Sequence, residues 1–317
     1  MARKSTAERA RHTRIACGAL LALALVLAGC GDGGGGGGAA AERAASAEAT
    51  GAPFDPPQEV VMPTTSVDGN PAAIDVSHVN EGYVAASGRS SARLKLQVTC
   101  GEMTYNYDLP NDGTPTFYPV NMGSGSYGFR VMENIEGTTY AELTSTYVDV
   151  ALNSETCPFV VPNLYCDYDE DSTCVEQARE LTEDCENQGE AVRDICSWVV
   201  GAISYDYDKA EELAQSTGYV PDPDETLETR TGICFDYASL TAAMLRSVGL
   251  PAQVVTGYVS PDALYHAWVM VRVDGTWQTV QFSVTPNQWS RCDVTFASTG
   301  GDAFSGDGTT YTDRYTY

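Results

Sequence analysis

The chain has 317 residues, 43% of them apolar, and a formal net charge of −25 at pH 7. Such an acidic protein is repelled by nucleic acid and by anionic lipid, so no nucleic-acid partner is expected. The roughly 250 residues that follow the N-terminal low-complexity stretch are enough for two modest domains.

Residues 1–29 are predicted to be a targeting segment. Basic residues precede the apolar run Ile15–Ala28, and the sequence Leu27-Ala28-Gly29-Cys30 resembles a bacterial lipobox. Cleavage before Cys30 and diacylation of its thiol would tether the mature protein to the membrane. The alternatives are an ordinary signal peptide or a transmembrane anchor, and the apolar run is shorter than the ~20 residues that a span needs. We therefore expect an extracytoplasmic lipoprotein that is lipidated at Cys30.

Residues 30–59 are predicted to be a flexible spacer. They include the glycine run Gly33–Gly38, followed by alanine, glutamate and serine with little to bury. No core is expected before about Val60.

Residues 60–155 are predicted to form a small all-β domain. Alternating or Thr/Tyr/Val-rich segments are separated by turn residues at Pro110–Gly113 and Glu136–Gly137. The predicted strands include Leu94–Val98, Tyr127–Val131 and Thr139–Val150.

Residues 156–317 are predicted to form the second, catalytic domain. From Thr173 the spacing of apolar residues becomes helical and predicts two helices. Their apolar positions are Val175, Ala178, Leu181 and Cys185, followed by Ala191, Ile195, Trp198, Val199 and Ala202. A loop is then expected over Tyr205–Glu228, stiffened by Pro221-Asp222-Pro223-Asp224. This loop is either one wall of a substrate cleft or a simple surface crossing.

Cys234 lies directly after a glycine and an isoleucine, at the start of a predicted helix that Gly249 and Pro251 end. One helix face carries Tyr237, Leu240, Met244 and Val248. The free N–H groups and the dipole at a helix N-terminus favour the thiolate form of a cysteine. Cys234 is therefore predicted to be a nucleophile.

A thiolate nucleophile needs a basic or cationic partner, and the chain has only three histidines. His12 lies in the targeting segment and His78 lies far upstream, which leaves His266. The segment Tyr265–Val273 alternates as a strand, with His266 on the face opposite the aliphatic one.

Four motifs occur in a characteristic order: Gly232–Ala238 around the cysteine, Met244–Pro251, Gly257–Tyr258, and Tyr265–Trp268 around the histidine. Together they resemble the transglutaminase-like superfamily of papain-like thiol enzymes. This resemblance implies an α+β fold whose nucleophile helix packs on an antiparallel sheet, preceded here by the small all-β domain. It also implies that Cys234 is the nucleophile, that His266 is the base, and that an aspartate on a later strand orients the histidine.

The position of that aspartate differs from the compact form of the family. There it follows a tryptophan by four residues in the strand after the histidine strand, but here Trp277 is followed at that distance by Gln281. The same spacing recurs from Trp289 to Asp293, in a segment that resembles members with an extra hairpin. The resemblance assigns the role to Asp293, and Gln281 is the competing candidate.

Seven of the ten cysteines remain after Cys30, Cys234 and one in the targeting segment are set aside. Most of them should pair in an oxidising compartment, although connectivity cannot be deduced from sequence. Proximity favours Cys100 with Cys157 and Cys166 with Cys174.

No metal or other cofactor is expected. The chain lacks a C-x-x-C pair, and one usable histidine cannot build an ordinary zinc site. Asp167–Asp171 resembles the start of a calcium loop but lacks the glycine at the sixth position and the glutamate at the twelfth.

The sequence thus predicts a thiol enzyme in which Cys234 attacks an amide carbonyl, His266 protonates the leaving amine and Asp293 holds the imidazole. Water as the acceptor gives a peptidase or amidase, and an amine gives a transglutaminase; hydrolysis is favoured because an exposed thioester meets water. The expected partners are a protein, peptide or cell-wall peptide substrate and, through the lipid anchor, the membrane. The alternative is a non-catalytic surface binding module that retains the fold.

Overall fold

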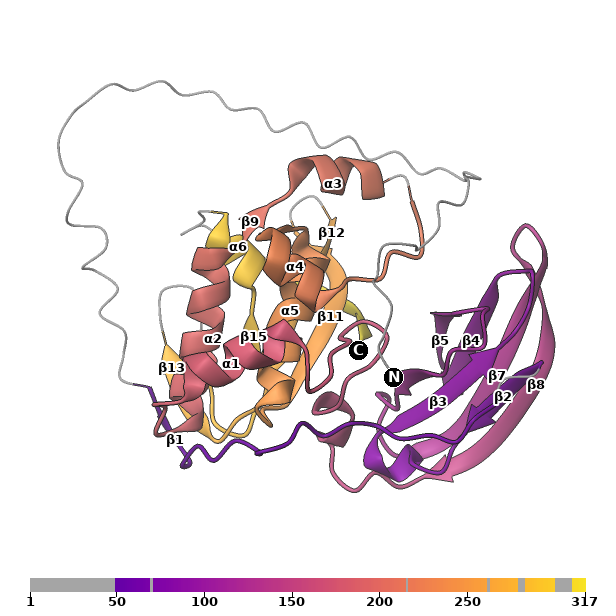
Figure 1. Ribbon diagram of the computed structural model, residues 1–317, viewed down its shortest axis with the longest axis horizontal. Coiled ribbons are helices and arrows are strands. Elements are labelled where there is room, and N and C mark those ends of the chain that lie inside the picture. The colour runs from indigo at the N-terminus through magenta and orange to yellow at the C-terminus, as the bar shows by residue number, and fades with distance from the viewer. Residues whose placement is uncertain (1–48, 69–70, 215, 261–262, 279–282, 300–309) are drawn as a thin grey trace.

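The computed structural model describes residues 49–68, 71–214, 216–260, 263–278, 283–299 and 310–317. A strand-rich N-terminal region lies beside a C-terminal region of helices and strands (Figure 1). This architecture confirms the expected α+β class with a preceding strand-rich region. The predicted signal segment, Cys30 and the glycine run lie outside the described residues.

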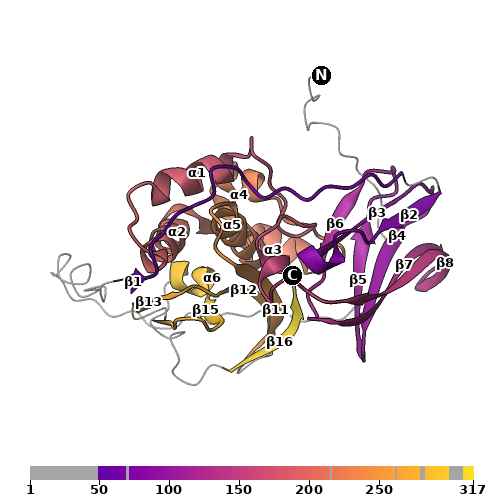
Figure 2. The same cartoon turned by 90° about the horizontal axis from the view of Figure 1, so that it is seen from below.

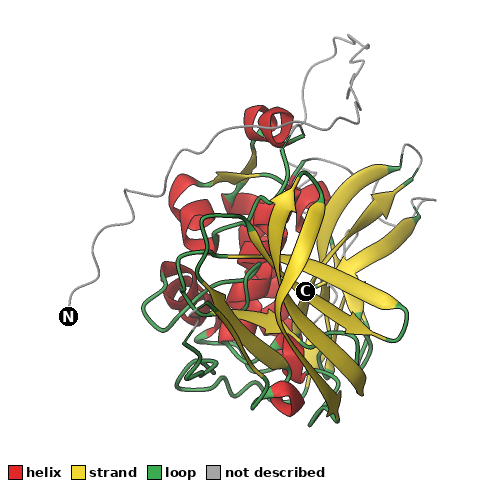
Figure 3. Cartoon of the chain, turned by 90° about the vertical axis from the view of Figure 1, so that its right-hand side faces the viewer, coloured by secondary structure: helices red, strands yellow, loops and turns green. Residues whose placement is uncertain are grey.

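Two antiparallel sheets form the N-terminal region, and Figure 3 shows their strands in front of the helices. The smaller sheet has the order β2 (Ala72–Asp75), β3 (Tyr83–Gly88), β6 (Thr116–Pro119), with the 3-10 turn η1 (Val79–Glu81) between β2 and β3. The larger has the order β5 (Met103–Leu109), β4 (Leu94–Cys100), β7 (Gly125–Glu136), β8 (Thr139–Val150).

Alternation along β4 explains how this region forms its core. Leu94, Leu96 and Val98 are fully buried, whereas the residues between them are partly exposed. Because side chains of a strand point alternately to its two faces, one face of β4 packs inward. The predicted strands at 94–98, 127–131 and 139–150 are confirmed.

The C-terminal region is built on a four-stranded antiparallel sheet and the helix α5 (Cys234–Ser247). The sheet has the order β15 (Ser290–Cys292), β12 (Leu264–Val271), β11 (Ala252–Val259), β16 (Tyr311–Thr316). The predicted helices are confirmed as α1 (Thr173–Thr182) and α2 (Gln188–Ala202). Smaller elements are η2 (Cys157–Phe159), the parallel pair β9 (Ser204–Tyr205) and β10 (Thr231–Gly232), and α6 (Val294–Ser298).

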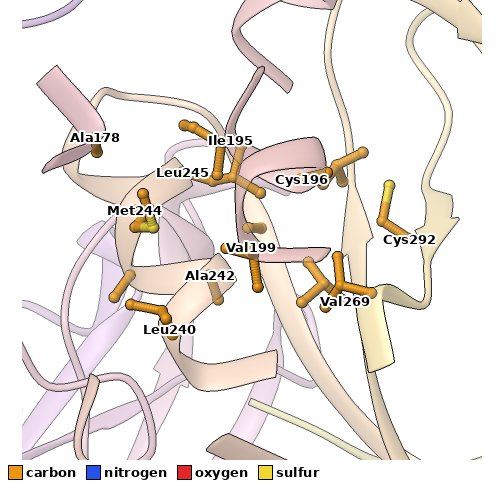
Figure 4. Close-up of a cluster of buried hydrophobic side chains, with 14 of the residues drawn as sticks. Ala178, Ile195, Cys196, Val199, Leu240, Ala242, Met244, Leu245, Val269 and Cys292 are labelled. Carbon is orange, nitrogen blue, oxygen red and sulfur yellow. The ribbon is translucent and has the colours of Figure 1, made fainter. Parts of the chain in front are cut away.

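Helix α5 is more deeply buried than its periodicity suggests. Every residue from Asp236 to Ser247 is buried, not only those of one face. Figure 4 shows its side chains meeting residues of α2 and β12, with Ala178 of α1 nearby and Cys292 of β15 beside Cys196 of α2. Small side chains such as Ala238 and Ala242 let other elements approach closely on several sides, which makes α5 the central helix of the domain.

Residues 49–59 differ from the prediction of a flexible spacer. Ala49 is buried in the core of the C-terminal region, and β1 (Thr50–Gly51) pairs with β13 (Gly275–Gln278). The amide of Ala52 donates a hydrogen bond of 2.6 Å to the carbonyl of Asp274. This segment forms a strap along the helical domain, and the chain continues from it toward the β-sheets (Figure 2). Backbone pairing orders it, and Ala49 and the partly buried Phe54 pack against the core of the C-terminal region.

The prediction of a loop over Tyr205–Glu228 is wrong, because this segment forms the helices α3 (Tyr207–Leu213) and α4 (Pro223–Thr229). The side chains of Asp206 and Asp222 accept backbone N–H groups and cap the two helices. A proline suits the first position of a helix, so the Pro-Asp-Pro-Asp sequence is a helix start rather than a stiff loop.

The expected disulfides are also wrong for the described cysteines, all of which are free. Cys157 Sγ donates to the carbonyl of Ser154 at 3.1 Å, and Cys166 Sγ lies 3.8 Å from the carbonyl of Ser239. These thiols therefore have partners other than Cys100 and Cys174. The free cysteines are Cys100, Cys157, Cys166, Cys174, Cys185, Cys196, Cys234 and Cys292.

Within the described parts of the chain, no helix is both long and apolar enough to cross a membrane.

Candidate active site

Cys234 is the first residue of α5, and its side chain is half-buried. The strand β10, which ends at Gly232, leads directly into this helix. A Cβ atom at Gly232 would lie 2.6 Å from the Cβ of Asp236, so only glycine allows the chain to turn this tightly into the helix. The helix N-terminus and its unpaired N–H groups thus lie next to the thiol.

His266 lies on β12 and is only 3% exposed. Its ring stacks on that of Phe296 at a centroid distance of 4.1 Å and an interplanar angle of 11°. The predicted strand alternation is correct, but the face that carries His266 is covered as well, by Phe296 and by the buried Trp268. The imidazole is therefore held in a fixed orientation within a largely dry environment.

Asp293 lies 2.8 Å from His266, measured from carboxylate Oδ2 to imidazole Nε2. A carboxylate has no proton to give, so Nε2 carries the hydrogen and donates. The other oxygen, Oδ1, accepts the amide of Phe296 at 3.1 Å and caps helix α6. The Asp293 side chain thus orients His266 and also caps α6, the helix whose Phe296 stacks on the imidazole.

The charge balance at His266 favours imidazolium. Burial alone would lower its pKa, but the negative charges of Asp293 and Cys234 and the hydrogen bonds to both overcome this effect and raise the pKa to about 10. Because Nε2 contacts Asp293, Nδ1 is the imidazole nitrogen that is hydrogen-bonded to Cys234. The structure therefore brings together the three predicted site residues: Cys234 from the start of α5, His266 from β12 and Asp293 from the junction of β15 and α6.

The hairpin expected before Asp293 is present. β13 (Gly275–Gln278) pairs with β14 (Ser283–Val284), and together with β1 they form a sheet separate from the one that carries His266. The chain then returns as β15, which pairs with β12. The competing candidate Gln281 lies outside the described residues.

Asp236, two residues after Cys234, was given no role by the sequence motifs. It is fully buried and accepts the amide of Ile233 at 2.8 Å, the ammonium of Lys209 at 2.8 Å and the hydroxyl of Tyr219. Lys209 lies on α3, so this carboxylate ties the start of α5 to the segment before it. An acidic residue at the third position of a helix is the sequence signal for the amide contact, whereas the contacts of Lys209 and Tyr219 depend on tertiary structure.

Tyr205, at the end of β9, also lies near the thiol. Burial, followed by the negative charge of Cys234, raises the pKa of its phenol. The sequence predicts a loop at Tyr205, but the parallel pairing of Tyr205 with Gly232 brings it to the start of α5. In the described part of the chain, no group of three or more His, Cys, Asp or Glu side chains could hold a metal ion.

Comparisons with known proteins locate the family signal in this domain. Residues 175–282 match the family model described as the transglutaminase-like superfamily. That span contains Cys234 and His266 and ends before Asp293, so the assignment of Asp293 depends on the geometry.

The similar proteins cover the chain unevenly. A UPF0252 protein from Methanocaldococcus jannaschii is 34% identical over 94 residues, which is 27% of this chain and 27% of the relative, so this chain spans under a third of that relative. Among solved structures, red sea bream transglutaminase is 13% identical over 76% of this chain and 53% of its own, with a TM-score of 0.29. A candidate cysteine protease from Cytophaga hutchinsonii is 17% identical over 82% of this chain and 86% of its own, with a TM-score of 0.34.

Proposed function

Because residues 175–282 belong to the transglutaminase-like superfamily, we propose that this protein is a thiol enzyme acting on amide bonds. Cys234 is the nucleophile, His266 its proton-transfer partner and Asp293 the residue that orients the imidazole. The observation that carries the proposal is the contact of His266 with both other side chains: 2.8 Å to Asp293, and a hydrogen bond to Cys234 at the start of α5.

The reaction would begin from a thiolate–imidazolium pair. A pKa of about 10 keeps His266 protonated at neutral pH, so the histidine first stabilises the thiolate and then acts as an acid. Sγ of Cys234 bonds to the carbonyl carbon, and the oxyanion is stabilised by the unpaired N–H of Cys234. His266 gives its proton to the leaving nitrogen as the C–N bond breaks, which leaves a thioester and a neutral amine.

The second half of the reaction returns the thiolate. His266, now neutral, takes a proton from the acceptor as this attacks the thioester, and the C–S bond breaks. Water as the acceptor gives a carboxylic acid, and an amine gives a new amide. We favour hydrolysis of protein, peptide or cell-wall amides, because Cys234 is half-buried rather than enclosed and a thioester in reach of water hydrolyses.

We further propose that the enzyme is a lipoprotein of the extracytoplasmic membrane surface. The support is the lipobox-like sequence that ends at Cys30. Figure 2 shows the strap that enters the domain at β1, beside β13.

Selective thiol labelling tests the enzymatic proposal. Iodoacetamide at pH 6, followed by peptide mass spectrometry, should modify Cys234 at least about tenfold faster than Cys157, which is also half-buried but lies outside the site. Denatured protein should lose this preference. Equal labelling of both cysteines in the folded protein would instead support a binding module without an activated thiol.

The Cys234→Ala variant provides the matching control. It should lose thiol-dependent activity and keep its thermal unfolding midpoint within a few degrees, because a half-buried cysteine contributes little packing. Loss of folding would show that Cys234 is a structural residue.

A further inference from the structure

Asp293 has a third partner besides His266 and Phe296. The hydroxyl of Tyr311 donates to Asp293 Oδ2 at 2.8 Å, to the same oxygen that accepts Nε2 of His266. We propose that Tyr311 is a positioning residue of the site: its hydroxyl orients the Asp293 carboxylate and competes with His266 for the negative charge of Oδ2. This inference rests on the proposed function, because it concerns how the reactive pair is held.

The ring of Tyr311 is fixed from two directions. The guanidinium carbon of Arg291 lies 3.6 Å from the ring centroid, a close cation–π contact. The buried ring of Trp268 meets it edge-on at 4.9 Å, with an interplanar angle of 80°. Because Arg291 lies over the ring and Trp268 packs against it edge-on, the hydroxyl has little freedom to turn away from Asp293.

The backbone brings Tyr311 to this position through a close strand approach. Tyr311 opens β16 and pairs with Val259 of β11. A Cβ atom at Gly257 would lie 2.1 Å from the carbonyl oxygen of Thr312, so β16 can approach β11 here only because this residue is glycine. Gly257 belongs to one of the four family-like motifs, which gives that glycine a specific structural task.

Tyr311 acts as a donor throughout the working pH range. Burial, together with the adjacent Asp293, raises the pKa of its phenol well above the ordinary value of 10. The hydroxyl therefore stays protonated and withdraws charge from Oδ2. Two donors compete for one oxygen, so the pull of Asp293 on imidazolium is weaker than it would be without Tyr311.

The physical consequence is a defined basicity for His266. The titratable or charged groups near this imidazole are Cys234 of α5 and Asp293 after β15, with Tyr311 of β16 and Arg291 of β15 behind the carboxylate. Replacing Tyr311 by phenylalanine removes one donor and leaves the ring. Asp293 then stabilises imidazolium more strongly, so the pKa of His266 should rise.

An NMR titration of the histidine Cε1–H signals tests this directly. The chain has only three histidines, and a His266→Gln variant identifies the signal. We expect a midpoint near pH 10 in the wild type and an upward shift of about 0.5 pH unit in Tyr311→Phe. The matched control is Tyr315→Phe on the same strand. The Tyr315 ring packs on Tyr105, so in this variant the midpoint of His266 should equal that of the wild type.

A double variant separates positioning from general loosening. In an Asp293→Asn background, Tyr311→Phe should produce no upward shift, because the carboxylate charge is absent. An unchanged or lowered midpoint in Tyr311→Phe, with folding verified by circular dichroism, would overturn the inference.

The labelling experiment keeps the two proposals distinct. If wild-type Cys234 is activated but Tyr311→Phe leaves the midpoint unchanged, only the role of Tyr311 fails. If wild-type Cys234 shows no preference over Cys157, the enzymatic proposal fails, and the role of Tyr311 in it fails as well.

Discussion

His266 and Asp293 are separated by 27 residues in sequence, yet their side chains meet at 2.8 Å in a buried contact. The residues between them include the paired strands β13 and β14, which belong to another sheet. The contact exists because β15 pairs with β12 and delivers Asp293 just beyond the strand end. An insertion can therefore separate the two residues in sequence without moving them apart in space.

The first prediction separates the charge of Asp293 from its capping role. Asp293→Asn keeps an oxygen that can cap α6, whereas Asp293→Ala removes both functions. Both variants should lower kcat by orders of magnitude, up to about the 10⁴-fold seen when the serine-protease aspartate is neutralised. Only the alanine variant should also lose about 1 kcal/mol of unfolding free energy, measured by chemical denaturation.

Gln281→Ala is the competing variant for this prediction. It should retain most of the activity, apart from a modest change in KM. If Gln281→Ala loses activity while Asp293→Asn keeps it, the orienting residue is Gln281 instead.

The second prediction concerns pH and stability. The pKa of His266 is raised in the folded protein to about 10, from an ordinary value of 6.5. A raised pKa stabilises the fold below the unfolded value and loses this contribution as the pH climbs through the folded value. The difference in unfolding free energy between wild type and His266→Gln should therefore be largest near pH 6 and should shrink between pH 6.5 and 10.

Denaturation curves at several pH values measure this difference directly. A gap between wild type and His266→Gln that widens with pH would contradict the assigned ion pair.

The third prediction tests the link between α3 and the start of α5. Lys209→Met removes the cation 2.8 Å from the fully buried Asp236, whose other donors are Ile233 N–H and Tyr219. Because the Lys209 side chain is 28% exposed, the loss should be about 1–2 kcal/mol, below the cost of breaking a fully buried pair. Amide exchange should accelerate in α3.

Lys95→Met is the control for this variant, since Lys95 pairs with the partly exposed Asp108 in the β-region. It should change stability by less than about 1 kcal/mol. Equal losses in both variants would mean that the Asp236 contact has no special weight.

The fourth prediction concerns the membrane anchor. Cys30→Ala should leave the precursor unprocessed or release the protein from membranes, because the thiol that carries the lipid is absent. The folded domain should keep its thermal unfolding midpoint. Metabolic labelling with a fatty acid measures the modification, and continued acylation of the variant would contradict the lipoprotein assignment.

Local patterns in the sequence were sufficient for the elements that carry the site. The glycine before the cysteine and the helical spacing after it predict a helix that begins at Cys234, and alternation predicts the strand that carries His266. Both signals depend on residues within a few positions of one another, where backbone geometry sets the side-chain period. The role of Asp293 was also predicted from a local spacing, the one from Trp289 to Asp293, by way of the family resemblance.

Tertiary structure decided what depends on distant segments meeting. The strap at residues 49–59 is ordered by backbone pairing with β13, which no side-chain pattern signals. Lys209 contacts Asp236 from α3, a helix that the sequence pattern did not predict. Tyr311 contacts Asp293 from the last strand, β16. Such contacts join residues whose relative position is set only once the sheet and helices have packed together. A single sequence therefore identifies the chemistry of each group but does not identify the residue that it contacts.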